Sequence, residues 1–287
     1  MSLKAKSTVL GKLLIALDLT YMDDLLIQYA AFLKKQLKLE HVVLYHNIKL
    51  NEPDKISGIL ENLDRPLEDI LRKEIEQSVG DKLGDDYSIH IGQSDDTMDD
   101  MIAFMQRAKL QTVLFGKKLN YEGSGYLIER FISESPDINI IAYPETAHFN
   151  HSNVLLPTDF SRKSAVTIKN ALEINKELES SLLFMHVYTI PNIYFPYIPV
   201  KDMKKDIQKD ADREWEKFKR RYFQGMDLGE VAFSFDAEKS FAEIIYKFAV
   251  KNQINLIILP NKQSFMNNLI VQVLRRDMHI PLFFLDS

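Results

Sequence analysis

The stretch Asn153-Val154-Leu155-Leu156-Pro157-Thr158-Asp159-Phe160-Ser161 decides the fold. A short apolar run ends in an acid and a hydroxyl residue, and a helical pattern begins at once. The same arrangement stands 141 positions earlier, where residues 12–17 lead into Asp18 and Thr20. Each copy predicts a buried parallel strand that presents an Asp at the edge of a sheet, followed by a helix start. Ligands bind open α/β sheets at this edge.

The rest of the chain alternates short apolar strands with helical patterns, and it does so twice. We expect strands at 12–18, 41–48, 87–91, 112–115 and 138–143, then at 154–156, 182–187, 231–235, 256–259 and 282–285. We expect helices at 21–37, 66–83, 98–108 and from about 126, then at 163–178, 202–223, 241–250 and 265–275. This order predicts an α/β fold of two tandem open parallel sheets with helices on both faces. The predicted domains are 1–149 and 150–287, joined by a linker at 144–152.

The amino-acid composition argues against several classes of function. Residues 1–150 hold 17 Lys and Arg against 24 Asp and Glu, and the remainder holds 19 against 17. Neither half has the basic excess of a nucleic-acid-binding protein, so we expect no nucleic-acid partner. The apolar runs are short of a membrane span, and no signal peptide is evident. There is no cysteine, which excludes disulfides and Cys-based zinc sites and fits a cytoplasmic location.

Several short motifs, in order and in duplicate, resemble the universal stress protein family in its tandem form. They are residues 157–161, Asp18 at the matching place in the first half, His46 and His186-Val187 at the ends of the second strands, and residues 125–130 before the last strand. The resemblance implies the adenine nucleotide alpha hydrolase-like fold. It also implies an internal pseudo-dimer, in which the last strands of the two domains pair.

Members of that family that bind ATP use a loop after the fourth strand: Gly, two residues, Gly, nine residues, Gly, then Ser or Thr. Backbone N–H groups of such a loop approach phosphate oxygens closely. Here Gly116 fits the first glycine, but position 119 is Leu, and Gly123-Ser124-Gly125 closes the loop early. The candidate nucleotide-binding residues of the first domain are therefore Asp18, Gly116, Gly123, Ser124 and Gly125, with ATP or AMP as the possible ligand. The shortened loop predicts that ATP binding is not strong.

The second domain lacks the glycine loop. Its fourth strand ends at Pro260, which has no N–H donor, and polar residues replace the cradle. The candidate residues at this edge are Asp159, Ser161, Lys262 and Ser264, and a solvated loop is the simpler interpretation.

No catalytic constellation or metal site emerges. Asp18 and Asp159 have no visible acid–base partner, and an Asp at this place commonly caps the next helix. The acids at 95–100 fit a helix start, and the pair His148 and His151 has no cysteine beside it.

We therefore predict a cytoplasmic stress-response protein without enzymatic activity, which binds a ligand or partner and does not bind ATP strongly. One alternative is an ATP- or AMP-binding sensor, with slow ATP hydrolysis as an option. The other is a binder of an apolar small molecule under the aromatic, proline-rich segment 188–200. Expected partners are the paired domain, a second copy of the chain as an option, and an unidentified protein or small molecule.

Overall fold

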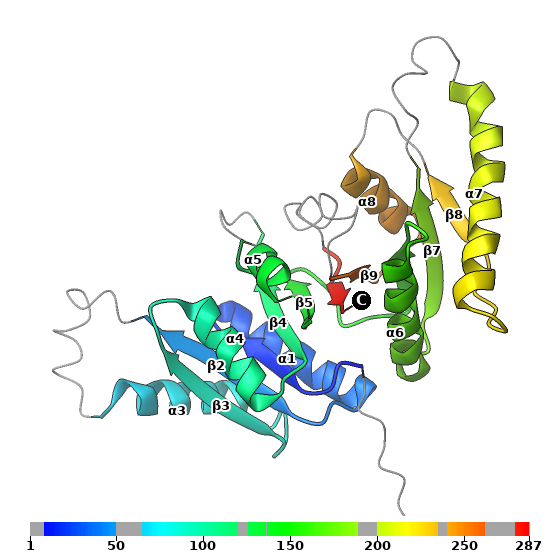
Figure 1. Ribbon diagram of the computed structural model, residues 1–287. Coiled ribbons are helices and arrows are strands. Elements are labelled where there is room, and N and C mark those ends of the chain that lie inside the picture. The colour runs from blue at the N-terminus through cyan, green and yellow to red at the C-terminus, as the bar shows by residue number, and fades with distance from the viewer. Residues whose placement is uncertain are drawn as a thin grey trace, which may run out of the picture. The chain divides into compact units, whose positions relative to one another are not determined.

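The computed structural model describes residues 9–49, 65–119, 126–135, 137–188, 200–234, 240–261 and 279–286. The chain divides into two compact units, Met1–Phe149 and Asn150–Ser287 (Figure 1). Each unit is built from parallel strands that alternate with helices. Each sheet therefore has all its carboxyl ends at one edge, the edge where ligands bind in such folds.

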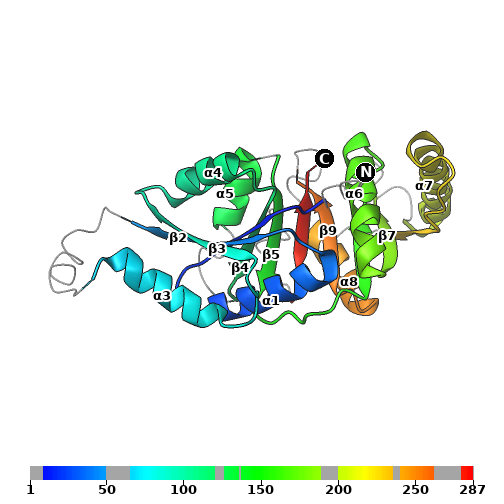
Figure 2. The same ribbon diagram turned by 90° about the horizontal axis from the view of Figure 1, so that it is seen from below.

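The first unit contains a five-stranded sheet in the order β3-β2-β1-β4-β5. Its strands are β1 (Leu13–Ala16), β2 (Val42–Ile48), β3 (Tyr87–Gln93), β4 (Thr112–Lys117) and β5 (Asn139–Pro144). Its helices are α1 (Tyr21–Leu37), α3 (Leu67–Val79), α4 (Thr97–Ala108) and α5 (Tyr126–Glu134). Figure 2 shows α1 and α3 on one face of this sheet and α4 and α5 on the other. Both faces are covered, and the central strands β1 and β4 are accordingly apolar and buried.

The second unit repeats this topology, with strand order β8-β7-β6-β9-β10. Its strands are β6 (Asn153–Pro157), β7 (Ser181–Val187), β8 (Val231–Ser234), β9 (Leu256–Pro260) and β10 (Leu282–Leu285). Its described helices are α6 (Arg162–Leu178), α7 (Val200–Tyr222) and α8 (Phe241–Lys251). Right-handed crossovers place α6 and α7 on one face of the sheet and α8 on the other. The predicted helix 265–275 lies outside the described residues.

The connection from the first strand to the first helix is the same in both units. Leu19 and Phe160 adopt left-handed backbone conformations, with φ of 57° and 60°. Thr20 and Ser161 then cap α1 and α6 and accept hydrogen bonds from the backbone N–H groups of Met22 and Ser164. A left-handed bulky residue is strained, so other contacts must hold the turn in place. Those contacts lie at the candidate site.

Candidate functional site

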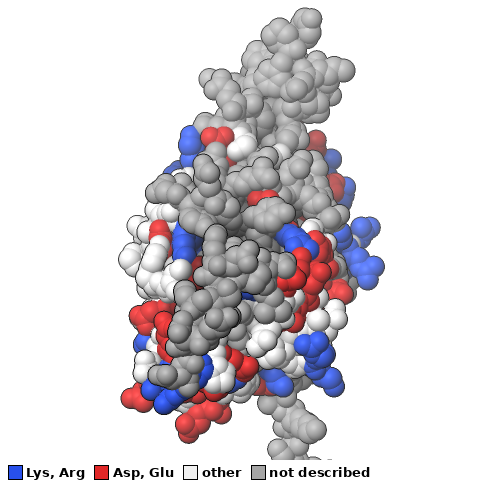
Figure 3. All heavy atoms as spheres, turned by 90° about the vertical axis from the view of Figure 1, so that its left-hand side faces the viewer, with Lys and Arg blue, Asp and Glu red and all other residues white. Residues whose placement is uncertain are grey.

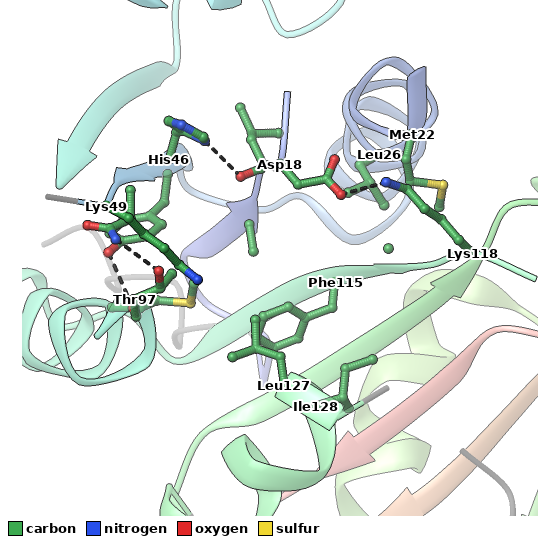
Figure 4. A pocket seen from close by; sticks show the side chains of 16 residues that line it. Asp18, Met22, Leu26, His46, Lys49, Thr97, Phe115, Lys118, Leu127 and Ile128 are labelled. Carbon is green, nitrogen blue, oxygen red and sulfur yellow. Dashed lines mark hydrogen bonds and ion pairs between the residues drawn. The ribbon is translucent and has the colours of Figure 1, made fainter. Parts of the chain in front are cut away.

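A pocket of about 570 Å³ opens at the carboxyl ends of β1, β2 and β4 in the first unit. Its apolar wall consists of side chains from three helices and a strand: Met22, Leu26, Met101, Phe115, Leu127 and Ile128. Its polar rim consists of Asp18, Tyr45, His46, Asn47, Lys49, Thr97 and Lys118. Figure 4 shows Phe115, Leu127 and Ile128 across the pocket from Asp18 and Lys118. An apolar cavity of this size with a few convergent polar groups is the usual form of a small-molecule site.

Asp18 stands directly after β1 and is the acidic group of this pocket. Its carboxylate accepts hydrogen bonds from Lys118 Nζ at 2.7 Å and from Thr20 Oγ1 at 2.6 Å. Partial burial opposes ionisation of the carboxyl group, but the bonds from Lys118 and Thr20 outweigh it and lower the pKa of Asp18. Asp18 is therefore an ionised acceptor at neutral pH. It does not cap α1, which corrects the sequence interpretation, because Thr20 occupies the cap position.

His46 stands at the end of β2 and lines the pocket. Its Nδ1 donates to the carbonyl oxygen of Leu17 at 3.1 Å (Figure 4). His186 does the same in the second unit, where Nδ1 donates to the carbonyl oxygen of Thr158 at 2.7 Å. Both rings thus tie the second strand to the end of the first, and this shared contact is structural.

Gly116 lines the pocket from within β4 rather than from a loop after it. A Cβ atom added there would lie 2.7 Å from Met22 Cγ and 3.4 Å from Leu26 Cδ1. The glycine therefore lets α1 pack closely on β4. This packing role is a sufficient reason for glycine at position 116, whatever the pocket binds.

The amide that follows this strand already has an anionic partner. The N–H of Leu119 donates to Glu145 Oε1 at 3.0 Å, and the Tyr21 hydroxyl donates to the other oxygen of the same carboxylate. Lys118, between Gly116 and Leu119, is bonded to Asp18. In the described part of this loop, a carboxylate takes the N–H group that a phosphate cradle would offer.

The structure brings together Asp18 and Gly116 of the predicted nucleotide-binding residues. Gly123, Ser124 and Gly125 lie outside the described residues. Sequence reasoning did not place Lys49 in the pocket. Lys49 stands just after a predicted strand, and parallel strands bring their carboxyl ends together, so its position after the strand was the signal that could have found it.

The second unit holds its acid differently. Asp159 accepts from the backbone N–H of Ser161 at 3.0 Å and from Ser164 Oγ at 2.5 Å. Burial opposes ionisation, but bonds from both serines outweigh it and lower the pKa of Asp159. Ser161 caps α6, so both residues have structural partners. Lys262 and Ser264 lie outside the described residues.

Other expectations can be compared with the described residues. Asp96 caps α4 and forms an ion pair with Arg130 at 3.1 Å, so this acid of the cluster has structural partners. Within the described ranges, no group of three or more His, Cys, Asp or Glu is arranged to hold a metal ion, and no helix is both long and apolar enough to cross a membrane. Apart from Tyr188, the segment 188–200 lies outside the ranges whose side chains are described. Trp215 on α7 is buried.

Charges are mixed on the surface seen in Figure 3. There Lys and Arg side chains lie among Asp and Glu rather than in a field of one sign. A nucleic-acid-binding face would instead gather basic residues.

No family model matches the sequence, and no curated protein matches it. Solved structures do match over almost the whole chain. A functionally unknown protein from Pseudomonas aeruginosa PAO1 is 12% identical, with a TM-score of 0.61, and the match covers 97% of this chain and 93% of that one. A candidate universal stress protein from Pseudomonas aeruginosa UCBPP-PA14 is 13% identical, with a TM-score of 0.62 and coverages of 97% and 94%.

A universal stress protein from Archaeoglobus fulgidus DSM 4304 is also 13% identical, with a TM-score of 0.60, and the match covers 96% of each chain. At this identity the likeness concerns the backbone, and it extends through both units. The chain therefore has the fold of the universal stress proteins.

Proposed function

We propose that this protein is a non-catalytic, ligand-binding protein of the universal stress type, and that its ligand binds in the pocket of the first unit. The observation that carries the proposal is the pocket itself, which combines an ionised Asp18 with an apolar wall at the carboxyl ends of the strands. A planar, mostly apolar group fits against Phe115 and the aliphatic wall, while a hydroxyl of the ligand donates to Asp18. A nucleoside has both parts, and we propose a nucleoside or nucleoside monophosphate as the ligand class.

The surroundings of the pocket support binding rather than turnover. Asp18 is bonded to Lys118 and Thr20, and the Nδ1 of His46 donates to a backbone carbonyl. A general base needs a free acceptor within reach of the proton that it removes. Nε2 of His46 is such an acceptor, but among the described residues of the pocket no hydrogen bond joins it to a nucleophilic side chain.

The loop after β4 supports weak recognition of a triphosphate. Glu145 accepts the N–H of Leu119 and adds a negative charge near the end of β4. A bound triphosphate would be repelled by this carboxylate and would have to displace it. An ATP-binding sensor is therefore the second candidate function. It predicts that ATP binds more tightly than AMP, whereas the first candidate predicts the reverse order. The stress-response role and the cytoplasmic location stay predictions.

Isothermal titration calorimetry of the full chain with adenosine, AMP and ATP tests the proposal. We expect saturable binding of adenosine or AMP, tighter than that of ATP. Asp18→Asn should weaken it at least about tenfold, because a hydrogen bond to a charged acceptor contributes about 1.5–3 kcal/mol.

The matched control is Asp159→Asn, which changes the equivalent acid of the second unit and should leave the affinity unchanged. Absence of saturable binding by all three compounds would refute the proposal. Tighter binding of ATP than of AMP would favour the sensor instead.

A further inference from the structure

Asp23 is a buried carboxylate beneath the turn that carries Asp18. It lies in the first turn of α1 and is 7% exposed. It accepts the backbone N–H of Asp18 at 3.1 Å and that of Leu19 at 2.8 Å. Leu19 is the left-handed residue of this turn. Asp23 therefore holds the strained backbone that directs Asp18 to the pocket.

The second unit forms the same turn without a carboxylate at this position. Ser164 follows Asp159 by five residues, as Asp23 follows Asp18, and Phe160 has the left-handed conformation of Leu19. Ser164 Oγ lies 3.4 Å from the N–H of Asp159 and donates to the Asp159 carboxylate at 2.5 Å. A neutral hydroxyl is thus sufficient to build the turn. The acid of the first unit needs another explanation.

We infer that Asp23 is a proton-responsive positioning residue: its carboxyl group switches the hydrogen bonding of Asp18 and so couples ligand binding in the first-unit pocket to pH. The inference rests on the proposed function, since it assigns a regulation to the same pocket. It concerns a residue that does not itself line the pocket.

The environment of Asp23 places this switch within reach of physiological pH. Burial raises the pKa of Asp23 to about 6, and the charge of Asp18 adds to the rise, while the two backbone N–H bonds oppose it. The other charged or titratable groups around the turn include Lys118 after β4, His46 on β2, Tyr21 on α1 and Glu145 after β5. Asp18 itself stays ionised, because its pKa is lowered.

The direction of the coupling follows from donors and acceptors. Above about pH 6 the anionic Asp23 has no proton to donate and accepts the two amides. The Asp18 carboxylate, which accepts from Thr20 and Lys118, then keeps its remaining lone pairs for a ligand hydroxyl. Below that pH, Asp23 takes a proton from solvent and becomes a donor. The Asp18 carboxylate is the neighbouring acid whose charge and side-chain hydrogen bonding raise the pKa of Asp23, and it is the acceptor that we assign to this proton. The new bond occupies Asp18 as Ser164 occupies Asp159, and ligand affinity falls.

A ligand-free experiment on the full chain tests the switch directly. Backbone amide NMR signals of Asp18 and Leu19 should shift with pH, with a midpoint near the pKa of about 6. The shift should vanish in Asp23→Ser, which installs the second unit's residue, and in the isosteric Asp23→Asn. The control Asp24→Ser alters the neighbouring exposed acid, which pairs with Lys82, and should keep it. Amides that do not titrate, or a titration that persists in both Asp23 variants, would overturn the inference.

Calorimetry with adenosine gives the second readout. Wild-type protein should bind about tenfold more weakly one pH unit below the midpoint than one unit above it. Asp23→Ser and Asp23→Asn should bind at the wild type's low-pH affinity at both values. If the wild-type protein binds adenosine with the same affinity at both pH values, the inference is also overturned. If adenosine binds at neither pH while the amides titrate, the proposed function fails and the proton switch of the turn stands.

Discussion

At the residue scale, the loop after β4 shows how a single side chain changes what a backbone can bind. Position 119 holds Leu where ATP-binding members of the resembled family have their second glycine. Its N–H is not lost but donates to Glu145, whose carboxylate follows β5. Tyr21 donates to the same group from α1. Two segments distant in sequence thus meet at a carboxylate carried by a third, and this carboxylate occupies the N–H group that an anionic ligand could use.

Removing that carboxylate should improve the binding of phosphorylated ligands. We expect Glu145→Ala to raise the affinity for ATP about tenfold, because it frees the N–H of Leu119 and removes a repulsive charge. The measurement is calorimetry at low ionic strength, where such charges are least screened. Glu134→Ala, which removes an exposed acid paired with Arg130, serves as the control. An unchanged ATP affinity in Glu145→Ala would mean that the shortened loop itself, not the carboxylate, limits binding.

At the element scale, the pocket exists because α1 packs closely on β4. Met22 and Leu26 of the helix cover the backbone at Gly116, and the same two side chains form part of the apolar wall. Packing and ligand binding therefore share residues. A glycine at this position cannot by itself be assigned to phosphate recognition.

The packing role can be measured separately. Gly116→Ala should destabilise the protein by about 1–3 kcal/mol, the usual cost of overpacking a core, since the added methyl group would meet Met22 Cγ. Met22→Ala in the same chain should recover part of that loss, and chemical denaturation of the four proteins of the double-mutant cycle gives the coupling energy. Additive effects would show that the two residues do not interact. The Gly116→Ala variant would then need another explanation.

At the scale of the whole molecule, each unit ends in a strand, β5 or β10, that has a neighbouring strand of its own unit on one side. The backbone N–H of Asn139, the first residue of β5, donates to the carbonyl oxygen of Gln111 on the β4 side. The N–H of Glu145, directly after β5, donates to the carbonyl oxygen of Lys117 on the same side. Parallel strands alternate the direction of their N–H groups, so those of Ile140 and Ala142 point away from β4. In β10 the same alternation turns those of Leu282 and Phe284 away from β9. Such edges are exposed to aggregation unless they are covered.

The resemblance predicts that these two edges pair with each other within the chain. Hydrogen–deuterium exchange of the full-length protein tests this without mutation. The amides of Ile140, Ala142, Leu282 and Phe284 should be protected to the same extent as those of the central strands, because backbone pairing shields an N–H from exchange. Exchange of these four amides at the rate of exposed loop residues would contradict the pairing. Protection that depends on protein concentration would indicate pairing between two copies instead.

The sequence alone determined the fold, because the two periodic signals, short apolar strands and amphipathic helices, recur in one order twice. The predicted strands and helices that fall within the described residues agree with the structure within a few residues, and Asp18 lies at the predicted edge of the sheet. The sequence also predicted that the shortened glycine loop does not bind ATP strongly, and this stays a prediction.

Only the tertiary structure decided the partners of these residues. The pairing of Asp18 with Lys118 spans 100 positions, and that of Leu119 with Glu145 joins the ends of two strands. From the sequence, Asp23 looks like an ordinary acid in the first turn of a helix. The hydrophobic periodicity of the helix does not predict that this side chain is buried beneath Leu19. The physical reason is that periodicity reports which face of an element is buried. The hydrogen bonds and charges of a site depend on which side chains meet across elements.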